Sequence, residues 1–562
     1  MSSQRPDRKS GGPASPISPH LVEKARSELL PEQPDKGIRL AETGVALLLT
    51  LAVALLLARF LTSAGPLWRD EAGSVNLATQ ATWGEVSRNL EHEAFFWGWN
   101  GLVRCWVASG AGTSDAGLRV LGVLIAGAVA AGMWLAVRGT TGAPPMISLA
   151  LLGLNSTFLT FGASLRGYGL GMLLATVVFW AVWQFARHGG WSRGLLVLAA
   201  CVLSVHVLCY NSAAVFAGCV AGMIVLGRGR RWKLAASLLG AGALAAVSLV
   251  IYVPAIRRAQ QWNVLLRHDV TAAWLWKQFA SAFPGQTWLA WVWPALAIAV
   301  LWLAFTRRRA AERERSDLLL YCSSGMILAV ASYIAMLHAI SYYARPWYFL
   351  VLLALVAVSL DAASAALAQT ARQRLIRAGI ALLLSLLQIG NALAVTGERR
   401  SNMDVVASKI QAGSREGDLV LVSPWYYGVS FHRYYRGPAE VLTLPPMPKP
   451  LFHRYDWVKA RMEDPGATTQ ALLAPLEATL RNGHTIWLVG EIEAPPPGRR
   501  LPPIQRPEEI GWYDENYYEL WEMYVGAFLR SHAAHAQEIT IKLESPVSDL
   551  ENVRLLVMRG YK

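Results

Sequence analysis

The feature of this sequence that most limits its fold is a series of long apolar runs between residues 43 and 396. A helix needs about 20 mostly apolar residues to cross the roughly 30 Å hydrocarbon core of a bilayer. Eleven runs fit this pattern, near residues 43–62, 116–137, 145–163, 169–187, 193–209, 211–227, 233–253, 287–305, 318–338, 347–368 and 374–396. Backbone polar groups in lipid must be satisfied within the spanning segment. We therefore predict a polytopic α-helical membrane protein with about eleven transmembrane helices.

The composition agrees with a chain that lies largely in a bilayer. Hydrophobic residues make up 54% and charged residues 16% of the chain, against roughly 45–50% and about 25% in soluble domains. The net charge is +14, but lysine and arginine are spread over short connections, so we expect no nucleic-acid partner. Five cysteines lie in or near the apolar runs and none follows residue 397. This distribution excludes a disulfide framework or a zinc knuckle.

Basic residues occur in every second connection between the apolar runs. These connections lie near residues 138, 187–193, 228–233, 307–315 and 372–377, and the alternate short ones carry one arginine or none. Because lysine and arginine favour the cytoplasmic side, we predict a multi-pass protein of the cell inner (plasma) membrane with a cytoplasmic N-terminus. Eleven crossings then make the C-terminal segment extracytoplasmic. A single kinked element over 193–227 would instead invert the later half.

The chain divides into three regions by composition. Residues 1–38 are polar and rich in proline, and we predict a disordered cytoplasmic tail. Residues 39–396 form the transmembrane domain, whose two long outside loops, 63–115 and 254–286, are rich in tryptophan, as is typical of short helices at the bilayer interface. Residues 397–562 are predicted to form a small α/β domain, with strands at 418–423 and 485–490 and helices at 402–412, 470–482 and 515–531.

Ionisable residues at the membrane rim are functional candidates because they are costly to keep there. Arg69-Asp70-Glu71 follows the first apolar run. A carboxylate beside an arginine can stay ionised and serve as a general base, or it can merely cap the following helix. A second cluster, Glu91-His92-Glu93, has side chains that suit a divalent metal, but no matching outer cluster accompanies it. We therefore expect no cofactor.

These motifs resemble those of a known family. The chain resembles the polyprenyl-phosphate-sugar-dependent glycosyltransferases of the C-type superfamily in three places. These are the Asp70-Glu71 pair, a histidine motif at His92 followed by an aromatic run, and Asp115 to Arg119, which leads into the second predicted helix. That superfamily includes protein O-mannosyltransferases, aminoarabinose transferases of lipid A and a galacturonosyltransferase-like group. The resemblance covers roughly residues 40–435. The family often has His-Pro-Pro-aromatic where this chain has His92-Glu93-Ala94.

Two later motifs of the family are matched in part. Arg166 and Tyr168 keep the arginine and tyrosine of one motif without its acidic residue, and Tyr343 with Arg345 matches an arginine-aromatic segment entering a late helix. The resemblance implies an inverting glycosyltransferase with loop 63–115 as its catalytic loop, a polyprenyl-phosphate-linked sugar donor and a glycan, lipid or protein acceptor in the cell envelope.

Chemistry assigns roles to the matched residues. An acceptor hydroxyl needs a carboxylate to take its proton, which favours Asp70 as the catalytic residue, with Glu71 as the competing catalytic residue. Guanidinium groups suit a phosphate leaving group, which favours Arg166 and Arg345. The remaining expected substrate-binding residues are Arg69, His92, Glu93, Tyr168 and Tyr343. Two alternatives stay open: a membrane transporter or lipid flippase, although no repeated halves are visible, and a catalytically degenerate scaffold protein.

Overall fold

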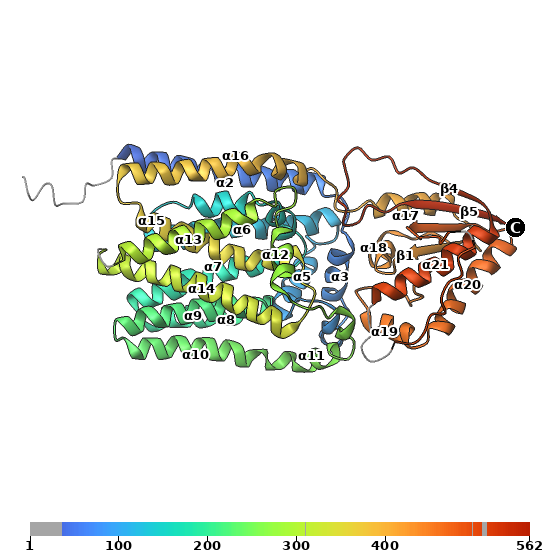
Figure 1. Cartoon of the computed structure of the whole chain (residues 1–562), viewed down its shortest axis with the longest axis horizontal. Coiled ribbons are helices and arrows are strands. Elements are labelled where there is room, and N and C mark those ends of the chain that lie inside the picture. Colours follow the sequence, from blue (N-terminus) through green and yellow to red (C-terminus); the bar gives the residue numbers. More distant parts are fainter. Residues whose placement is uncertain (1–35, 309–310, 497, 508–513) are drawn as a thin grey trace, which may run out of the picture.

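The computed structural model describes residues 36–308, 311–496, 498–507 and 514–562, and Figure 1 shows a long helical bundle joined to a smaller part that contains a sheet. Within these residues, nine helical segments have the length and composition to cross a membrane. They are α2 (Lys36–Ser63), α6 (Asp115–Thr141), α7 (Tyr168–His188), α9 (Asn211–Arg228), α10 (Trp232–Ser248) continued by α11 (Val253–Ala259), α13 (Leu289–Arg307), α14 (Arg313–Ile340), α15 (Leu350–Leu367) and α16 (Ala371–Thr396). A shorter apolar helix is α8 (Trp191–Val207). The prediction of a polytopic helical membrane protein is therefore confirmed, but the described residues contain nine candidate spans where about eleven were predicted.

The predicted tail falls almost wholly outside the described residues. Of residues 1–38, only 36–38 are described, and they form the first turn of α2 rather than irregular chain.

The apolar run at 145–163 differs from the continuous helix that we predicted. It contains two short π-helical segments, η2 (Leu149–Gly153) and η3 (Phe158–Gly162). Between them the Asn155 side chain accepts a hydrogen bond from the Phe158 amide (2.9 Å), and Thr157 donates to the Ala282 carbonyl (2.8 Å). The whole segment is buried in protein, where such contacts replace regular helical hydrogen bonds. A buried broken segment therefore takes the place of one predicted spanning helix.

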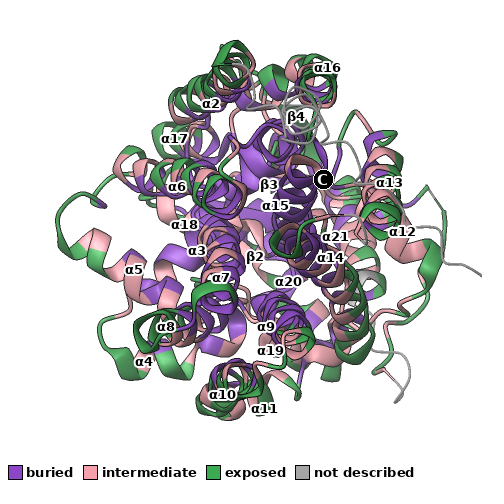
Figure 2. Cartoon of the chain, turned by 90° about the vertical axis from the view of Figure 1, so that its left-hand side faces the viewer, coloured by how far each residue is buried: buried purple, intermediate pink, exposed green. Residues whose placement is uncertain are grey.

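The bundle has a buried centre and an apolar outer surface. In the 18-residue apolar window of each span, 78% of the residues are buried in the α15 segment, against 22% in α13. Figure 2 shows α7, α9 and α15 inside a ring that includes α2, α10, α13 and α16. The outer helices expose large apolar side chains such as Leu55, Trp302 and Leu386. Exposed apolar surface on this scale is expected of helices that face lipid.

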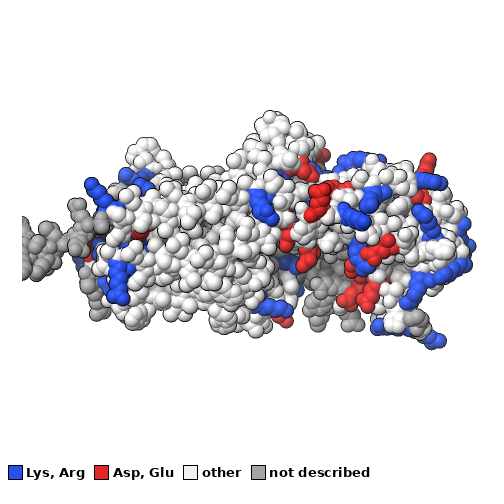
Figure 3. All heavy atoms as spheres, turned by 90° about the horizontal axis from the view of Figure 1, so that it is seen from above, with Lys and Arg blue, Asp and Glu red and all other residues white. Residues whose placement is uncertain are grey.

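Charged groups gather at the two ends of the bundle and leave its middle apolar. Figure 3 shows lysine and arginine at the end far from the sheet, a white central band, and mixed charges over the sheet-containing part. At the far end, Arg377 makes a 2.5 Å ion pair with Asp361 and a 3.4 Å ion pair with Glu42, which also pairs with Arg374. This buried network ties α2, α15 and α16 together.

The C-terminal part is a five-stranded sheet covered by helices on both faces. Its strand order is β2-β1-β3-β5-β4, with β1 (Leu419–Ser423), β2 (Glu440–Thr443) and β3 (Ile486–Gly490) parallel and β4 (Ala533–Glu538) and β5 (Leu555–Tyr561) antiparallel to their neighbours. Successive residues of a strand face opposite sides. One core therefore joins one set to α17 (Met403–Gly413) and α18 (Tyr427–Tyr434), and the other core joins the alternate set to α19 (Tyr455–Glu463), α20 (Pro465–Arg481) and α21 (Asp514–His532). Both predicted strands and all three predicted helices are present.

The two parts meet through loop 63–115. This loop forms the short helices α3 (Arg69–Ala78), α4 (Trp83–Arg88) and α5 (Trp97–Ala108), and α3 and α5 lie between the bundle and the sheet in Figure 1. Arg433 of α18 makes a 2.6 Å ion pair with Asp115, and Tyr434 donates a 2.6 Å hydrogen bond to the same carboxylate. These contacts seat the C-terminal part on the end of the bundle where the candidate residues lie.

Candidate functional site

The candidate residues surround a cavity of about 600 Å³ between the bundle and the C-terminal part. Its walls come from several segments: residues 68–70, 92–94, 265–268, 342–343 and 347–348, Arg166, Arg345, and C-terminal residues that include Tyr426, His453, Tyr455 and Tyr518. Seven of the nine predicted site residues line it: Arg69, Asp70, His92, Glu93, Arg166, Tyr343 and Arg345. Glu71 and Tyr168 do not. The cavity is therefore built by segments far apart in the sequence.

Asp70 lies in the first turn of α3, with its carboxylate on the cavity wall. Its Oδ2 is 3.7 Å from Arg166 Nη2, and its Oδ1 is 3.6 Å from His453 Nε2 and 3.9 Å from Arg69 Nε. Burial alone would raise the pKa of Asp70, but the nearby Arg166, His453 and Arg69 side chains lower the pKa below its usual value. The carboxylate is therefore ionised at neutral pH and can accept a proton.

Glu71, predicted as the competing catalytic residue, does not line the cavity. Its side chain is fully buried and is bound by Arg119, and it accepts a hydrogen bond from the Leu165 amide (3.0 Å). Arg119 also donates to the Pro66 carbonyl (2.8 Å). Neighbouring residues on a helix point about 100° apart, and these contacts hold the Glu71 side chain away from the cavity that Asp70 lines. Glu71 instead holds α6 and the chain before Arg166 against α3.

His92 lines the cavity between two aromatic rings. Its ring stacks on Phe452 (5.6 Å between centroids) and on Trp262 (5.9 Å). Burial lowers the pKa of His92 to about 4, with Asp456 and Glu91 acting in the opposite direction, so the ring is neutral near pH 7. Neighbouring Glu91 is held by Arg258 through hydrogen bonds of 2.9 and 2.8 Å. Among the described residues, no group of three or more His, Cys, Asp or Glu side chains is arranged to hold a metal ion.

Arg166 is neutralised by two carboxylates. Its Nη1 donates to Glu93 Oε2 (3.0 Å) and to the Asp70 carbonyl (2.9 Å), and its guanidinium lies 4.7 Å from the Phe95 ring centroid. Tyr168 is buried beside it, with its ring edge-on to Phe95. These contacts make Arg166 a group that positions Asp70 and Glu93, and they leave it less free for a phosphate than the sequence suggested.

Arg345 is a predicted site arginine whose charge no carboxylate neutralises among the described residues. Its guanidinium lies 4.6 Å from the Tyr343 ring centroid, and it makes no ion pair or hydrogen bond with other side chains in the described part of the chain. Arg267 lines the same cavity and likewise makes no side-chain ion pair or hydrogen bond among the described residues, although no sequence motif marked it. An antiparallel bridge pairs Arg267 with Tyr342, and the Tyr343 amide donates to the Leu266 carbonyl (3.3 Å). Arg267 and Arg345 therefore belong to two segments that lie side by side.

His453 is the second residue that sequence analysis missed. It lies just before α19 in the C-terminal part, and its Nδ1 is 3.8 Å from Glu93 Oε1 while its Nε2 faces Asp70. Its ring stacks on Tyr455 (6.3 Å). No local pattern marks it, because its partners precede it by most of the chain. The C-terminal part thus contributes a side chain to the carboxylate cluster.

Arg69 anchors the wall of the cavity. Its backbone amide donates to the buried Glu551 carboxylate (2.7 Å), and its guanidinium lies 4.7 Å from the Tyr426 ring centroid. Its Nη1 donates to the Leu550 carbonyl. Through these contacts Arg69 joins the two parts of the chain beside Asp70.

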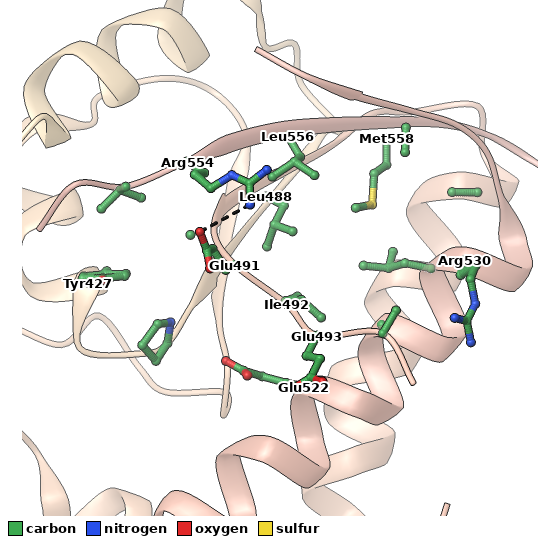
Figure 4. Close-up of a pocket in the computed structure, with 18 of the residues that line it drawn as sticks. Tyr427, Leu488, Glu491, Ile492, Glu493, Glu522, Arg530, Arg554, Leu556 and Met558 are labelled. Carbon is green, nitrogen blue, oxygen red and sulfur yellow. Dashed lines mark hydrogen bonds and ion pairs between the residues drawn. The ribbon is translucent and has the colours of Figure 1, made fainter. Parts of the chain in front are cut away.

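A larger cavity of about 1020 Å³ lies within the C-terminal part, between α21 and the β3, β5 and β4 strands (Figure 4). Leu488, Leu556 and Met558 form its apolar floor, and Glu491 pairs with Arg554 at 3.4 Å. None of the predicted site residues lines it. Tyr426 belongs to both cavities, so the two are neighbours. The smaller cavity holds the ionised carboxylate and the free arginines, and we therefore take it as the reactive site.

No protein-family model matches the chain, and no curated protein sequence matches it. Among solved structures, it is similar to ArnT from Cupriavidus metallidurans in the apo state, at 13% identity and a TM-score of 0.48, over 79% of this chain and 92% of that one. ArnT bound to undecaprenyl phosphate matches at 12% identity and a TM-score of 0.46, over 79% and 92%. The Archaeoglobus fulgidus oligosaccharyltransferase, in complex with zinc and sulfate, matches at 11% identity and 0.43, over 78% and 67%.

Proposed function

We propose that this chain is an inverting glycosyltransferase that moves a sugar from a polyprenyl-phosphate donor to an acceptor of the cell envelope. One observation carries the proposal: an ionised carboxylate, Asp70, and two arginines that have no carboxylate partner among the described residues, Arg267 and Arg345, line one cavity at the end of a membrane bundle. The phosphate of a lipid-linked sugar lies at the headgroup level of the bilayer, which corresponds to this end of the bundle. The motifs at Asp70 and Arg345 resemble those of polyprenyl-phosphate-sugar-dependent glycosyltransferases.

The reaction that fits this arrangement is a direct displacement. The acceptor oxygen forms a bond to the anomeric carbon of the sugar and loses its proton to the Asp70 carboxylate. The bond between that carbon and the phosphate oxygen breaks, and its electron pair leaves with the phosphate. Arg345 and Arg267 stabilise the charge that develops there. Attack from the opposite side inverts the configuration at the anomeric carbon.

The surrounding residues keep Asp70 ready for this step. Arg166 and His453 lie on either side of its carboxylate, and Arg166 also binds its backbone carbonyl. Glu93 shares both partners, so the cluster holds two carboxylates between an arginine and a histidine. We assign no step to a metal ion or cofactor, and turnover is expected to survive a chelator.

The pH dependence of the reaction tests the role of the Asp70 environment. A general base works only when deprotonated, so kcat/KM falls as the pH drops through the pKa of Asp70. Because that pKa is lowered, the acid limb should lie below the usual aspartate value of about 3.9. His453→Gln removes one of the lowering contacts and should move the limb to higher pH. The matched change His535→Gln, on exposed β4, should leave it in place, and an equal shift in both variants would contradict this role.

We further propose that the cavity opens on the outer face of the inner membrane and that the basic end of the bundle faces the cytoplasm. Cysteine labelling in cells tests this in a Cys105→Ser background, since Cys105 is exposed. Glu416→Cys in the C-terminal part should react with an impermeant reagent, and Glu312→Cys at the basic end should stay protected; both positions are exposed in the structure. The reverse pattern would put the donor cavity in the cytoplasm and contradict the proposal.

A further inference from the structure

A second charged cavity lies at the end of the bundle far from the sheet, where α7 and α9 end and α14 begins. It has a volume of about 380 Å³ and is lined by Trp183, Arg187, Arg231, Arg313, Glu314 and Asp317, among others. This volume falls within the range of about 300–1,000 Å³ that is typical of small-ligand sites. Neither the predicted motifs nor the proposed reaction uses any of these residues.

The charges of this cavity leave a positive excess. Arg187 neutralises Glu314 through a 2.6 Å ion pair, and neighbouring Arg228 neutralises Asp317 at 3.2 Å. Both lining carboxylates are therefore occupied. Arg231 donates to the Ala186 and Arg187 carbonyls at the end of α7 and has no carboxylate partner in the part of the chain that the structure describes. Arg313 makes no ion pair or hydrogen bond through its side chain within the described residues, so two positive charges remain for an anion.

A buried donor in the wall also lacks an acceptor. Trp183 is only 2% exposed, and its indole Nε1 has no hydrogen-bond partner among the residues that the structure describes. Leaving such a donor unpaired costs free energy comparable to a lost hydrogen bond. The first turn of α14, which begins at Arg313, has no side-chain cap, so its backbone N–H groups are also free for an anion.

The position of the cavity indicates the source of that anion. Trp191 and Trp232 begin α8 and α10 at the same end of the bundle and are 80% and 66% exposed. Exposed tryptophans favour the headgroup level of a bilayer. Basic pockets between membrane helices at this depth suit lipid headgroups. We propose that this cavity binds the phosphate of an anionic phospholipid in the leaflet opposite the reactive site.

Native mass spectrometry of the full-length purified protein tests the proposal, with phosphatidylglycerol and phosphatidylcholine as probes. Phosphatidylglycerol should be retained and phosphatidylcholine should not. Arg313→Gln removes an exposed charged side chain and should weaken phosphatidylglycerol binding by about tenfold or more. Trp183→Phe keeps the ring but removes the N–H, and should weaken it by about threefold to tenfold. Thermal unfolding of each variant confirms that it is folded.

Arg307→Gln is the matched control, because Arg307 is an exposed arginine at the same end and does not line the cavity. It should leave phosphatidylglycerol binding unchanged. Equal binding of the two lipids, or an equal loss in Arg307→Gln and Arg313→Gln, would reduce the effect to general surface charge and overturn the proposal. Binding of inorganic phosphate that phosphatidylglycerol fails to displace would overturn the lipid source.

Discussion

Asp70→Asn is expected to lower turnover by about 100-fold or more, the usual scale for a positioned general base. The amide keeps the shape of the side chain but cannot accept the acceptor's proton. Donor binding should change little, because the free arginines of the cavity belong to other segments. Turnover is measured as glycoside formation from the lipid-linked donor, and donor affinity with a non-transferable polyprenyl-phosphate analogue.

Glu71→Gln is the control that separates catalysis from folding. It changes the neighbouring carboxylate in the same way, but Glu71 is fully buried against Arg119 and does not reach the cavity. Removing its charge leaves a buried guanidinium unneutralised, which is strongly destabilising. The expected effect is a lower thermal stability, with nearly normal turnover in the molecules that stay folded. Normal turnover in Asp70→Asn together with a stable, inactive Glu71→Gln would transfer the catalytic role to Glu71.

The membrane fold could be predicted from the sequence because hydrocarbon selects for length and apolarity. The runs that became α2, α6 and α16 satisfy this requirement without help from their neighbours. Residues 145–163 satisfied it too, yet the segment is broken around Asn155. Polar residues 155–157 within the run were the available signal. Its regular hydrogen bonds could be given up only because other parts of the bundle supply partners, and the sequence does not show those partners.

The site could be predicted only where its residues are close in sequence. Residues 69–71 could be recognised as candidates because they are charged and follow an apolar run. The choice between Asp70 and Glu71, however, depended on which side of α3 faces the cavity. Arg166 belongs to a recognisable motif, but its ion pair with Glu93 is known only from the structure. Arg267 and His453 reach the cavity through loop pairing and the docking of the C-terminal part. No local pattern encodes such contacts.

Arg345→Ala is expected to weaken binding of the lipid donor by about tenfold to a hundredfold, the scale of one charge-assisted hydrogen bond to phosphate. Arg345→Lys keeps the charge but loses the paired donors of the guanidinium, so its affinity should lie between those of wild type and alanine. Arg267→Ala should behave like Arg345→Ala, since both side chains face the cavity without a carboxylate partner among the described residues. The double variant should be weaker than either single one.

Arg257→Ala provides the comparison for this series, because Arg257 is an exposed arginine of α11 outside the cavity wall. Its donor affinity should equal that of wild type. Arg166→Ala should have a different effect from Arg345→Ala and Arg267→Ala: loss of the Arg166 contacts with Asp70 and Glu93 should reduce turnover more than donor affinity. A scaffold would depend on none of these arginines, and a flippase would move lipid without forming glycoside. Unchanged donor affinity in both Arg345→Ala and Arg267→Ala would remove the phosphate from this cavity, and with it the leaving group on which the glycosyltransferase proposal depends.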